Sequence, residues 1–521
     1  MSSVMFQGTA SNVGKSIIVA GICRVMTQDG YNVVPFKAQN MSLNSFIDEN
    51  GLEMGRAQVF QAEACEKKPK AYMNPVLLKP CGNHISQIIV NGEVIGNMSS
   101  KEYHSYKKEL IPILDNIFQD LSKKYDAVIM EGAGSPAEIN INSLDISNMK
   151  MAEIADSPVI LVADIDRGGV FASIVGTLQL LKESERSRVK GVIINKFRGN
   201  KDYFQEGIHM LENIINIPVL GLLPYFNLKL DEEDGVSNKF NRKVNRYDAF
   251  VNIEIVKLPH MSNYTDFEVF EHIEKVNVRY IDIGERVGNF DKYGKHSMPD
   301  MLIIPGSKAT IEDIRYLKDS GLYEEIKKYA SEKRLLIGIC GGYQILGEKI
   351  YDEFGNDGSK GFEEGFGFFK MNTVFSNEKI TVQIKGMFGK ETGYFKNLQG
   401  NIINGYELHL GRRLSLDDKI KDDLCNKKED LSIKDNYLLE KEKLQYEVVE
   451  GHILGTYCHG FFDNIKFTSE IINNIRKTKN ISRIDVEDRS LEELKRLEYD
   501  KLANIIRENI DIKKIYEIIF E

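Results

Sequence analysis

The sequence predicts an α/β protein of two domains, each built on a mainly parallel sheet covered by helices. Its 521 residues exceed the size at which a single hydrophobic core usually stops growing. Short apolar runs that end in Gly or Asp alternate with helix-length segments, which is the pattern of a parallel sheet with helical crossovers. A polar and charged stretch over residues 227–246 interrupts this pattern before it resumes, which indicates a boundary between two domains.

Residues 1–226 are expected to form the first domain, a doubly wound parallel sheet. Its strand candidates are apolar nearly throughout, as strands buried on both faces are. They are Val4–Gln7, Asn32–Phe36, Ala127–Glu131, Val159–Ala163, Gly191–Asn195 and Val219–Leu222.

We assign residues 227–248 to a linker, 249–470 to a second α/β domain, and 471–521 to a C-terminal helical extension whose amphipathic pattern indicates packing. Within the second domain, the dense Lys, Asp and Glu of residues 414–443 indicate a solvated surface insertion. The strand candidates of this domain are Phe250–Val256, Met301–Ile304, Leu335–Ile339 and His452–Tyr457.

Composition favours small-molecule chemistry. The formal charge of −9 gives no general attraction to nucleic acid or to anionic membranes, so we expect neither as a partner. Six scattered cysteines fit free thiols in a reducing compartment better than a disulfide framework. Because there is no basic leader and no apolar stretch long enough to span a bilayer, we expect a cytoplasmic protein. The sequence gives no indication of its oligomeric state.

A glycine loop follows the first strand and predicts an ATP site. Residues 8–16 read GTASNVGKS and lead into an apolar helix. In such a loop the backbone around Gly8, Thr9 and Gly14 turns its N–H groups onto phosphate oxygens, Lys15 reaches the outer phosphates, and Ser16 ligates Mg²⁺. Five residues separate the two glycines where the common pattern has four, so this is a variant loop.

Two later strand ends support the nucleotide site. Glu131 ends a strand at the edge where ligands bind in open α/β sheets, and we predict it as a second Mg²⁺ ligand. The alternative is a carboxylate that caps the next helix. Asn195 ends another strand and is a candidate to bond the adenine edge, although an Asn in a turn is also common.

The second domain carries a candidate nucleophile at a sharp turn. Residues 338–342 read GICGG between an apolar strand and a helix, an arrangement that exposes the thiolate of Cys340 and aims backbone N–H groups at an oxyanion. We predict the backbone amides of Gly341 and Gly306 as the oxyanion donors. The alternative is a buried, inert thiol, which the flanking glycines disfavour.

A nucleophilic thiol needs a base, and His459 is the best candidate because it follows a strand that is expected beside the turn. His409, in GYELHLG, is its rival. Cys458 has no flanking glycines and is assigned to the core.

Taken together, these residues resemble the cobyric acid synthase family along essentially the whole chain. The resemblance rests on FKAQNMSLNS from Phe36, EMGRAQVFQA from Glu53, EGAGSPAEIN from Glu131 and ADIDRGGVFAS from Ala163. The first domain is similar to the dethiobiotin synthetase type of phosphate-loop fold, whose loop has the same longer spacing. The second, with CGGYQ from Cys340, is similar to class I glutamine amidotransferases.

The resemblance implies a glutamine-hydrolysing ligase that uses ATP and Mg²⁺. Gln344 would hold the glutamine substrate, and Lys37, Gln39 and Asn40 follow the second strand where a corrinoid carboxylate would lie. The substrate implied is adenosylcobyrinic a,c-diamide, amidated at its b, d, e and g carboxylates, with no cobalt ligation by the protein. In the wider class a Glu follows two residues after the catalytic His, whereas this chain has Phe461. Glu407 is a candidate to orient His459 instead.

Two other functions stay open at this point. Cobyrinic acid a,c-diamide synthase has the same two modules but different target carboxylates, and the KAQNMSLNS segment argues against it. A regulatory ATPase switch with a degenerate amidotransferase domain is the alternative from another class, and the intact turn around Cys340 argues against degeneracy.

Overall fold

The structure, a computed structural model, describes residues 2–81, 85–139, 145–230, 250–290, 296–415 and 444–521. The chain divides into two compact units. Unit 1 comprises Met1–Asp48, Leu52–Gly235 and Lys495–Glu521, and unit 2 comprises Glu49–Gly51 and Val236–Leu494. Most of the segment predicted as a linker, and nearly all of the charged insertion, lie outside the described residues.

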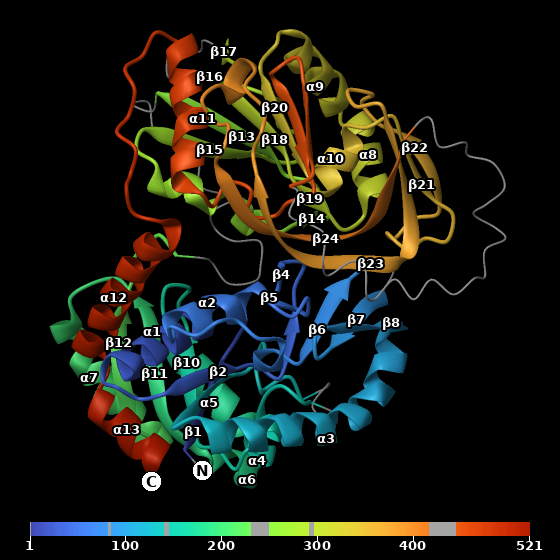
Figure 1. The fold of residues 1–521 in the computed structure, drawn as a ribbon. Coiled ribbons are helices and arrows are strands. Elements are labelled where there is room, and N and C mark those ends of the chain that lie inside the picture. Colours follow the sequence, from blue (N-terminus) through green and yellow to red (C-terminus); the bar gives the residue numbers. More distant parts are fainter. Residues whose placement is uncertain (1, 82–84, 140–144, 231–249, 291–295, 416–443) are drawn as a thin grey trace. The chain divides into compact units, whose positions relative to one another are not determined.

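Unit 1 is built on a six-stranded sheet in which every pair of neighbours is parallel (Figure 1). Each of the six strands predicted for the first domain is present, which confirms the fold class. In sheet order they are β12 (Val219–Pro224), β11 (Val189–Phe197), β10 (Val159–Asp164), β1 (Ser3–Gly8), β9 (Ala127–Glu131) and β2 (Val33–Phe36).

Successive side chains of a strand point to opposite faces of the sheet, and helices bury both faces of this one. On β1, Val4 and Phe6 belong to one core cluster and Met5 to the other. The cluster around Val4 contains side chains of α1 (Lys15–Gln28), α12 (Leu491–Asn509) and α13 (Ile512–Phe520). The cluster around Met5 contains side chains of α3 (Ser100–Lys124), α4 (Met149–Ile154), α5 (Val170–Leu180) and α7 (Gln205–Ile215).

The C-terminal helices complete the core of unit 1, although they follow unit 2 in the chain. Leu502, Ile506 and Ile515 are fully buried in the cluster around Val4. The amphipathic pattern predicted packing but not its partner. By contrast, α11 (Ile465–Thr478) buries Ile471 and Ile472 in the core of unit 2.

Unit 1 also contains shorter elements that the strand pattern did not predict. A four-stranded sheet has the order β3 (Gln39–Met41), β6 (Val76–Pro80), β7 (Ile85–Val90) and β8 (Glu93–Ser99). The remaining elements are β4 (Ser45–Ile47), β5 (Glu53–Gly55), α2 (Arg56–Ala64), α6 (Glu183–Arg186) and two 3-10 turns, η1 (Ala71–Met73) and η3 (Lys201–Phe204).

Unit 2 has a second six-stranded sheet, parallel except at the pairing of its last two strands. All four strands predicted for this domain are in it. Its order is β15 (Val276–Ile281), β13 (Val251–Val256), β18 (Met301–Ile304), β20 (Leu335–Ile339), β26 (Ile453–Thr456) and β25 (Tyr446–Val449).

Helices and a second sheet surround that sheet (Figure 1). The second sheet has the order β22 (Gly361–Glu364), β21 (Lys349–Asp352), β23 (Met371–Met387) and β24 (Ile402–Ser415). Two short two-stranded pairs join β14 (Met261–Ser262) to β19 (Gly306–Ser307) and β16 (Asn289–Phe290) to β17 (His296–Ser297). The helical elements are η4 (Tyr264–His272), α8 (Thr310–Asp319), α9 (Leu322–Ser331), α10 (Gly341–Ile345) and η5 (Gly393–Phe395).

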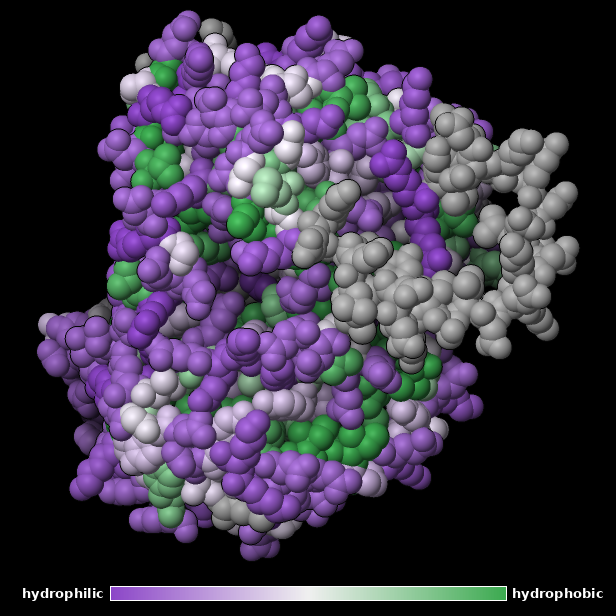
Figure 2. Space-filling view, in the orientation of Figure 1, coloured by the Kyte–Doolittle hydropathy of each residue, from purple (hydrophilic) through white to green (hydrophobic). Residues whose placement is uncertain are grey.

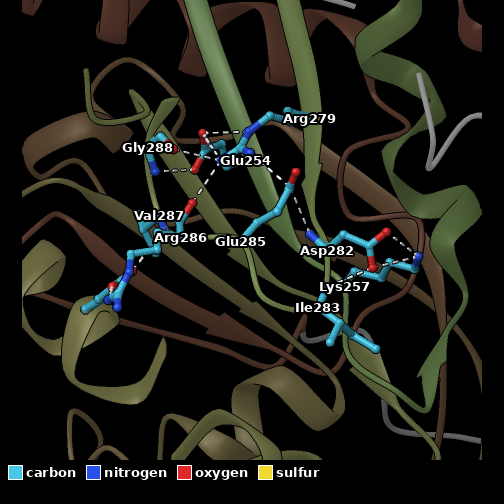
Figure 3. Close-up of polar contacts among 10 residues, drawn as sticks. Glu254, Lys257, Arg279, Asp282, Ile283, Glu285, Arg286, Val287 and Gly288 are labelled. Atoms are coloured by element: carbon cyan, nitrogen blue, oxygen red, sulfur yellow. Dashed lines mark hydrogen bonds and ion pairs between the residues drawn. The ribbon is translucent and has the colours of Figure 1, made fainter. Parts of the chain in front are cut away.

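A network of charged side chains lies at the β13–β15 side of the unit 2 sheet (Figure 3). Arg279 donates to Glu254 at 3.0 Å and to Glu285 at 3.1 Å, and the backbone N–H of Gly288 donates to Glu254 at 2.8 Å. These bonds satisfy the buried carboxylate of Glu254 and hold the segment after β15 against the sheet. The network is therefore structural.

The surface in view is mainly hydrophilic, with hydrophobic areas between the hydrophilic ones (Figure 2). No helix among the described residues is long and apolar enough to cross a membrane. The cysteines of the described residues are free thiols.

Candidate functional site

The phosphate loop of unit 1 joins β1 to α1. Asn12 and Gly14 take positive φ angles of 60° and 92°, which turn the chain sharply before the helix. A Cβ on Gly14 would lie 2.2 Å from the amide nitrogen of Asn195, so only glycine fits there. That amide donates to the backbone carbonyl of Val13 at 2.9 Å. Asn195 thus braces the loop, and its role at the adenine edge stays a prediction.

Lys15 is buried at the start of α1. Its ammonium group donates to the carbonyls of Ala10 at 3.3 Å and Gly134 at 3.2 Å. The first contact closes the loop on itself, and the second reaches the segment that follows β9. This is the position from which a lysine meets phosphate oxygens inside such a loop.

Glu131 is the centre of a fully buried polar cluster. Its carboxylate accepts from Ser16 at 2.8 Å and from Lys37 at 2.8 Å, and Gln61 donates to its second oxygen. Burial by itself would raise the pKa of Glu131, but the positive charges of Lys37 and Lys15 outweigh it and lower the pKa below its ordinary value. The carboxylate is therefore ionised.

This cluster fits a magnesium ion. A hydroxyl and an ionised carboxylate lie 2.8 Å apart beside the phosphate loop, and Mg²⁺ in nucleotide sites is typically held by one or two such oxygens together with phosphates. No group of three or more His, Cys, Asp or Glu suited to a metal occurs within the described parts of the chain. Ser16 and Glu131 are thus the candidate ligands of a phosphate-bound ion.

The three residues predicted to meet the corrinoid lie close to this cluster in sequence but differ in their contacts. Lys37 pairs with Glu131, whereas Gln39 accepts from the hydroxyl of Tyr103 at 2.5 Å. Asn40 is buried and accepts from the N–H of Met41 at 3.0 Å. Of these contacts, the one made by Lys37 reaches a predicted metal ligand.

In unit 2, Cys340 lies at a strained turn between β20 and α10. Its φ of 51° and ψ of −108° are unusual for a residue with a side chain. A Cβ on Gly342 would lie 2.0 Å from the carbonyl of Ile304, so the tight turn requires glycine. The Cys340 N–H donates to Thr456 of the neighbouring strand at 2.8 Å. These constraints fix the sulfur at the carboxyl end of the sheet.

His459 faces Cys340 and is oriented by Asp266. The Nδ1 of His459 lies 2.8 Å from a carboxylate oxygen of Asp266, and the other oxygen of that carboxylate accepts from the N–H of Gly460 at 3.0 Å. Both side chains are nearly fully buried. The contact between His459 and the Cys340 side chain completes a Cys–His–Asp arrangement.

The electrostatics of this arrangement favour a charged imidazole. Burial lowers the pKa of His459, but the negative charges and hydrogen bonds of Asp266 and Cys340 outweigh burial and raise the pKa to about 10. A thiolate beside an imidazolium is the reactive form of a catalytic cysteine.

The structure corrects one sequence-based hypothesis. Glu407 does not orient His459, because Asp266 occupies that position and Glu407 lies 3.5 Å from Nε2 of His409 instead. Asp266 was not predicted from the sequence, because in class I glutamine amidotransferases the orienting Glu stands two residues after the histidine, where this chain has Phe461. A signal was present, since Asp266 lies in a polar segment after β13, whose carboxyl end borders the site.

Backbone N–H groups also gather near the sulfur. β14 and β19 pair antiparallel, with Ser262 opposite Gly306 and Met261 opposite Ser307. The N–H of Lys308 donates to the carbonyl of His260 at 3.0 Å. Hydrogen-bonded pairs alternate along an antiparallel ladder, so the next such pair is Ser262 with Gly306. The N–H of Ser307 lies between these two pairs and takes no part in the ladder. A Cβ on Gly341 would lie 2.7 Å from the Ser307 nitrogen, so these two amides are neighbours.

Gln344 lies one turn after the nucleophile and is almost fully buried. Its Oε1 accepts from the hydroxyl of Thr310 at 3.5 Å, and its side chain also meets the hydroxyl of Tyr457. The side chain is thus held between α8 and the end of β26.

Comparison with known proteins places these two sites in a family. Residues 4–235 match the CobQ/CobB/MinD/ParA nucleotide binding domain, and residues 252–467 match the CobB/CobQ-like glutamine amidotransferase domain. The chain is also 47% identical to the cobyric acid synthase of Alkaliphilus metalliredigens over 99% of both chains. The chain belongs to the cobyric acid synthase family.

Other cobyric acid synthases match over similar lengths. The enzyme of Lachnoclostridium phytofermentans is 46% identical and that of Clostridium botulinum strain Loch Maree 45%, each over 100% of this chain and 99% of the relative. These matches favour cobyric acid synthesis over the a,c-diamide synthase and the nucleotide switch. A nucleotide-binding and a glutamine amidotransferase domain in one chain of this family make the protein a glutamine-dependent ligase of cobalamin biosynthesis.

Proposed function

We propose that this protein converts adenosylcobyrinic a,c-diamide to adenosylcobyric acid by amidating the b, d, e and g side-chain carboxylates. One ATP would be used for each amide, and glutamine would supply the nitrogen. The observation that carries the proposal is the buried Cys340–His459–Asp266 arrangement in a chain that also has a phosphate loop. The membership of the cobyric acid synthase family supports the choice of substrate.

In this proposal the glutaminase half of the reaction belongs to residues 249–470. The thiolate of Cys340 attacks the amide carbon of glutamine, and His459 gives a proton to the departing ammonia. The resulting thioester is hydrolysed by water, with His459 as the base. We propose the N–H groups of Gly341 and Ser307 as the oxyanion donors in place of Gly306, because the β14–β19 register engages the Gly306 amide.

The synthetase half belongs to residues 1–226. Lys15 and the loop amides would hold the ATP phosphates while the γ-phosphoryl group moves to a substrate carboxylate, forming an acyl phosphate. Ammonia then attacks the acyl carbon and phosphate leaves. Ser16 and Glu131 would hold Mg²⁺, which supplies positive charge for the transferred phosphoryl group. Lys37, Gln39 and Asn40 are proposed to meet the corrinoid, and Gln344 to meet glutamine.

One incubation tests the proposed function. The purified protein is supplied with ATP, Mg²⁺, glutamine and adenosylcobyrinic a,c-diamide, and product masses are followed by mass spectrometry. We expect amides to accumulate until the b, d, e and g positions are filled. If the a,c-diamide is not amidated while cobyrinic acid gains amides at a and c, the protein is the a,c-diamide synthase.

Two variants separate the half-reactions. Cys340→Ala is expected to lose amidation from glutamine and to keep amidation from added ammonia, because the synthetase site is intact. Lys15→Ala is expected to lose both. Ammonia-driven synthesis that survives in Lys15→Ala would remove ATP activation at this loop from the scheme.

A further inference from the structure

Two buried titratable side chains on β24 have no role in the mechanism above. Glu407 is fully buried and His409 nearly so. The Nδ1 of His409 lies 2.7 Å from the carbonyl of Gly411, and a carbonyl can only accept, so Nδ1 carries a proton. Nε2 lies 3.5 Å from a carboxylate oxygen of Glu407, a contact in which Nε2 donates and the carboxylate accepts. A buried carboxylate held in this way suits a group that donates hydrogen bonds and carries positive charge.

The register of β24 places this pair beside the nucleophile. Alternate residues of a strand share one face. On the face of Glu407 and His409, a Cβ on Gly405 would lie 2.2 Å from the carbonyl of His459, and a Cβ on Gly411 would lie 2.5 Å from the amide nitrogen of Gln344. Glu407 and His409 therefore lie between the catalytic histidine and Gln344.

Two more contacts tie the pair to the thiol site. The carbonyl of Leu408, between the two side chains, lies 3.6 Å from the sulfur of Cys340. The ring of His409 stacks on that of Tyr457 with centroids 4.0 Å apart. Tyr457 in turn lies two residues before His459. Glu407 and His409 thus line the thiol site, next to the position where Cys340 would attack an amide.

Glutamine carries the matching chemistry. With its side-chain amide at Cys340, its α-ammonium group lies a few bonds away and must find acceptors when it leaves water. Asp266 already uses one oxygen for His459 and the other for Gly460. We propose that the carboxylate of Glu407 binds the α-ammonium group of glutamine and that His409 positions this carboxylate through Nε2. This inference rests on the proposed glutaminase reaction of Cys340.

A comparison of two substrates tests it. Glutaminase activity is measured on glutamine and on 5-amino-5-oxopentanoate, which has the same amide and carboxylate but no α-amino group. Glu407→Gln is expected to lower kcat/KM for glutamine about 10- to 100-fold, the range for hydrogen bonds to charged groups. It is expected to leave kcat/KM for the analogue unchanged. His409→Asn, which keeps a donor for Gly411 but loses the Nε2 contact with Glu407, should show the same selectivity in a smaller degree.

Controls keep the outcomes apart. Glu254→Gln alters another buried carboxylate of unit 2, in the network of Figure 3, and should leave the ratio of the two kcat/KM values unchanged. Ammonia-driven amidation should persist in all three variants. Equal losses on both substrates, or no loss on either, would overturn the inference. Wild-type protein that hydrolyses neither substrate would instead refute the proposed function.

Discussion

The replacement Asp266→Asn tests how the structure activates its thiol. The carboxylate of Asp266 uses both oxygens, one for His459 and one for the N–H of Gly460. An asparagine has a single acceptor oxygen. If that oxygen stays with Gly460, the amide N–H₂ group faces Nδ1 of His459 and forces the proton onto Nε2. The imidazole can then no longer accept a proton from Cys340.

The size of the effect follows from the charge that is lost. The pKa of His459 lies at about 10, against an ordinary value of 6.5. At about 1.4 kcal/mol for each pKa unit, the surroundings favour the charged imidazole by about 5 kcal/mol. Asp266 supplies a large part of this, because an opposite charge in contact typically moves a pKa by about 1–3 units. We expect glutaminase kcat to fall by about 10³- to 10⁴-fold, as happens when a triad carboxylate becomes an amide.

The pH profile gives a second, independent readout. In the wild type the imidazolium persists until the pH approaches about 10, so glutaminase activity should hold on the alkaline side up to that value. Removing the carboxylate lowers the pKa of His459, and the alkaline limb should move to lower pH. Kinetics on glutamine from pH 6 to pH 11, with ammonia-driven amidation as the folding control, measure both effects.

A matched control is available in the same turn. Asp463 lies next to Gly460, with its carboxylate 3.0 Å from a Cβ built there, whereas Nδ1 of His459 pairs with Asp266. Asp463→Asn should retain the wild-type profile. If Asp266→Asn kept wild-type kcat and the same alkaline limb, the assignment of Asp266 as the residue that orients His459 would be wrong.

Three further predictions concern unit 1. Glu131→Gln leaves Lys37 buried without its counter-charge, so urea unfolding should show a free energy of unfolding lower by about 3–5 kcal/mol. Calorimetry should also show weaker binding of Mg²⁺–ATP. Gln58→Met should raise Tm, because the fully buried Gln58 amide has no hydrogen-bond partner among the described residues, and an unmet group costs about 1–3 kcal/mol. Ser3→Ala removes a buried hydroxyl that likewise has no partner there and should give a smaller rise. A fall in Tm for Gln58→Met would show that the amide is satisfied. Gly21→Ala places a methyl group 2.5 Å from Ile506 and should destabilise unit 1 by about 1–3 kcal/mol. The control Gly176→Ala adds a methyl group that meets no atom within 4 Å and should stabilise unit 1. Equal effects of the two variants on stability would refute the packing of α12 on α1.

Much of the fold was accessible from the sequence because it depends on local patterns. The strands of a parallel sheet are buried on both faces, so each predicted strand stands out as an apolar run bounded by turn residues. The phosphate loop and the turn at Cys340 are equally local, since glycines and the reactive residue lie within nine positions or fewer. For the same reason the sequence places Lys15 and Ser16 at the start of a helix after the loop and Cys340 at the turn before α10, where the structure has them.

The elements that were missed depend on distant partners. The strands β21 to β24 and β3 to β8 alternate or mix polar and apolar residues, and their pairing is set by tertiary contacts that no short window contains. The placement of α12 is of the same kind. Its apolar stripe predicts that it packs, but Ile506 meets Gly21 across almost the whole length of the chain.

The residue that orients His459 could not be predicted from a local sequence pattern. An imidazole needs only an acceptor at Nδ1, and a carboxylate from any neighbouring strand end can provide it. In this chain the position two residues after His459 belongs to Phe461, whose ring is fully buried against Phe462 and Phe467 at centroid distances of 5.3 and 5.1 Å. A charged side chain in that aromatic core would lose its hydration without gaining a partner. The carboxylate therefore comes from Asp266, nearly two hundred positions earlier in the chain, and only the three-dimensional arrangement of η4 beside His459 identifies it.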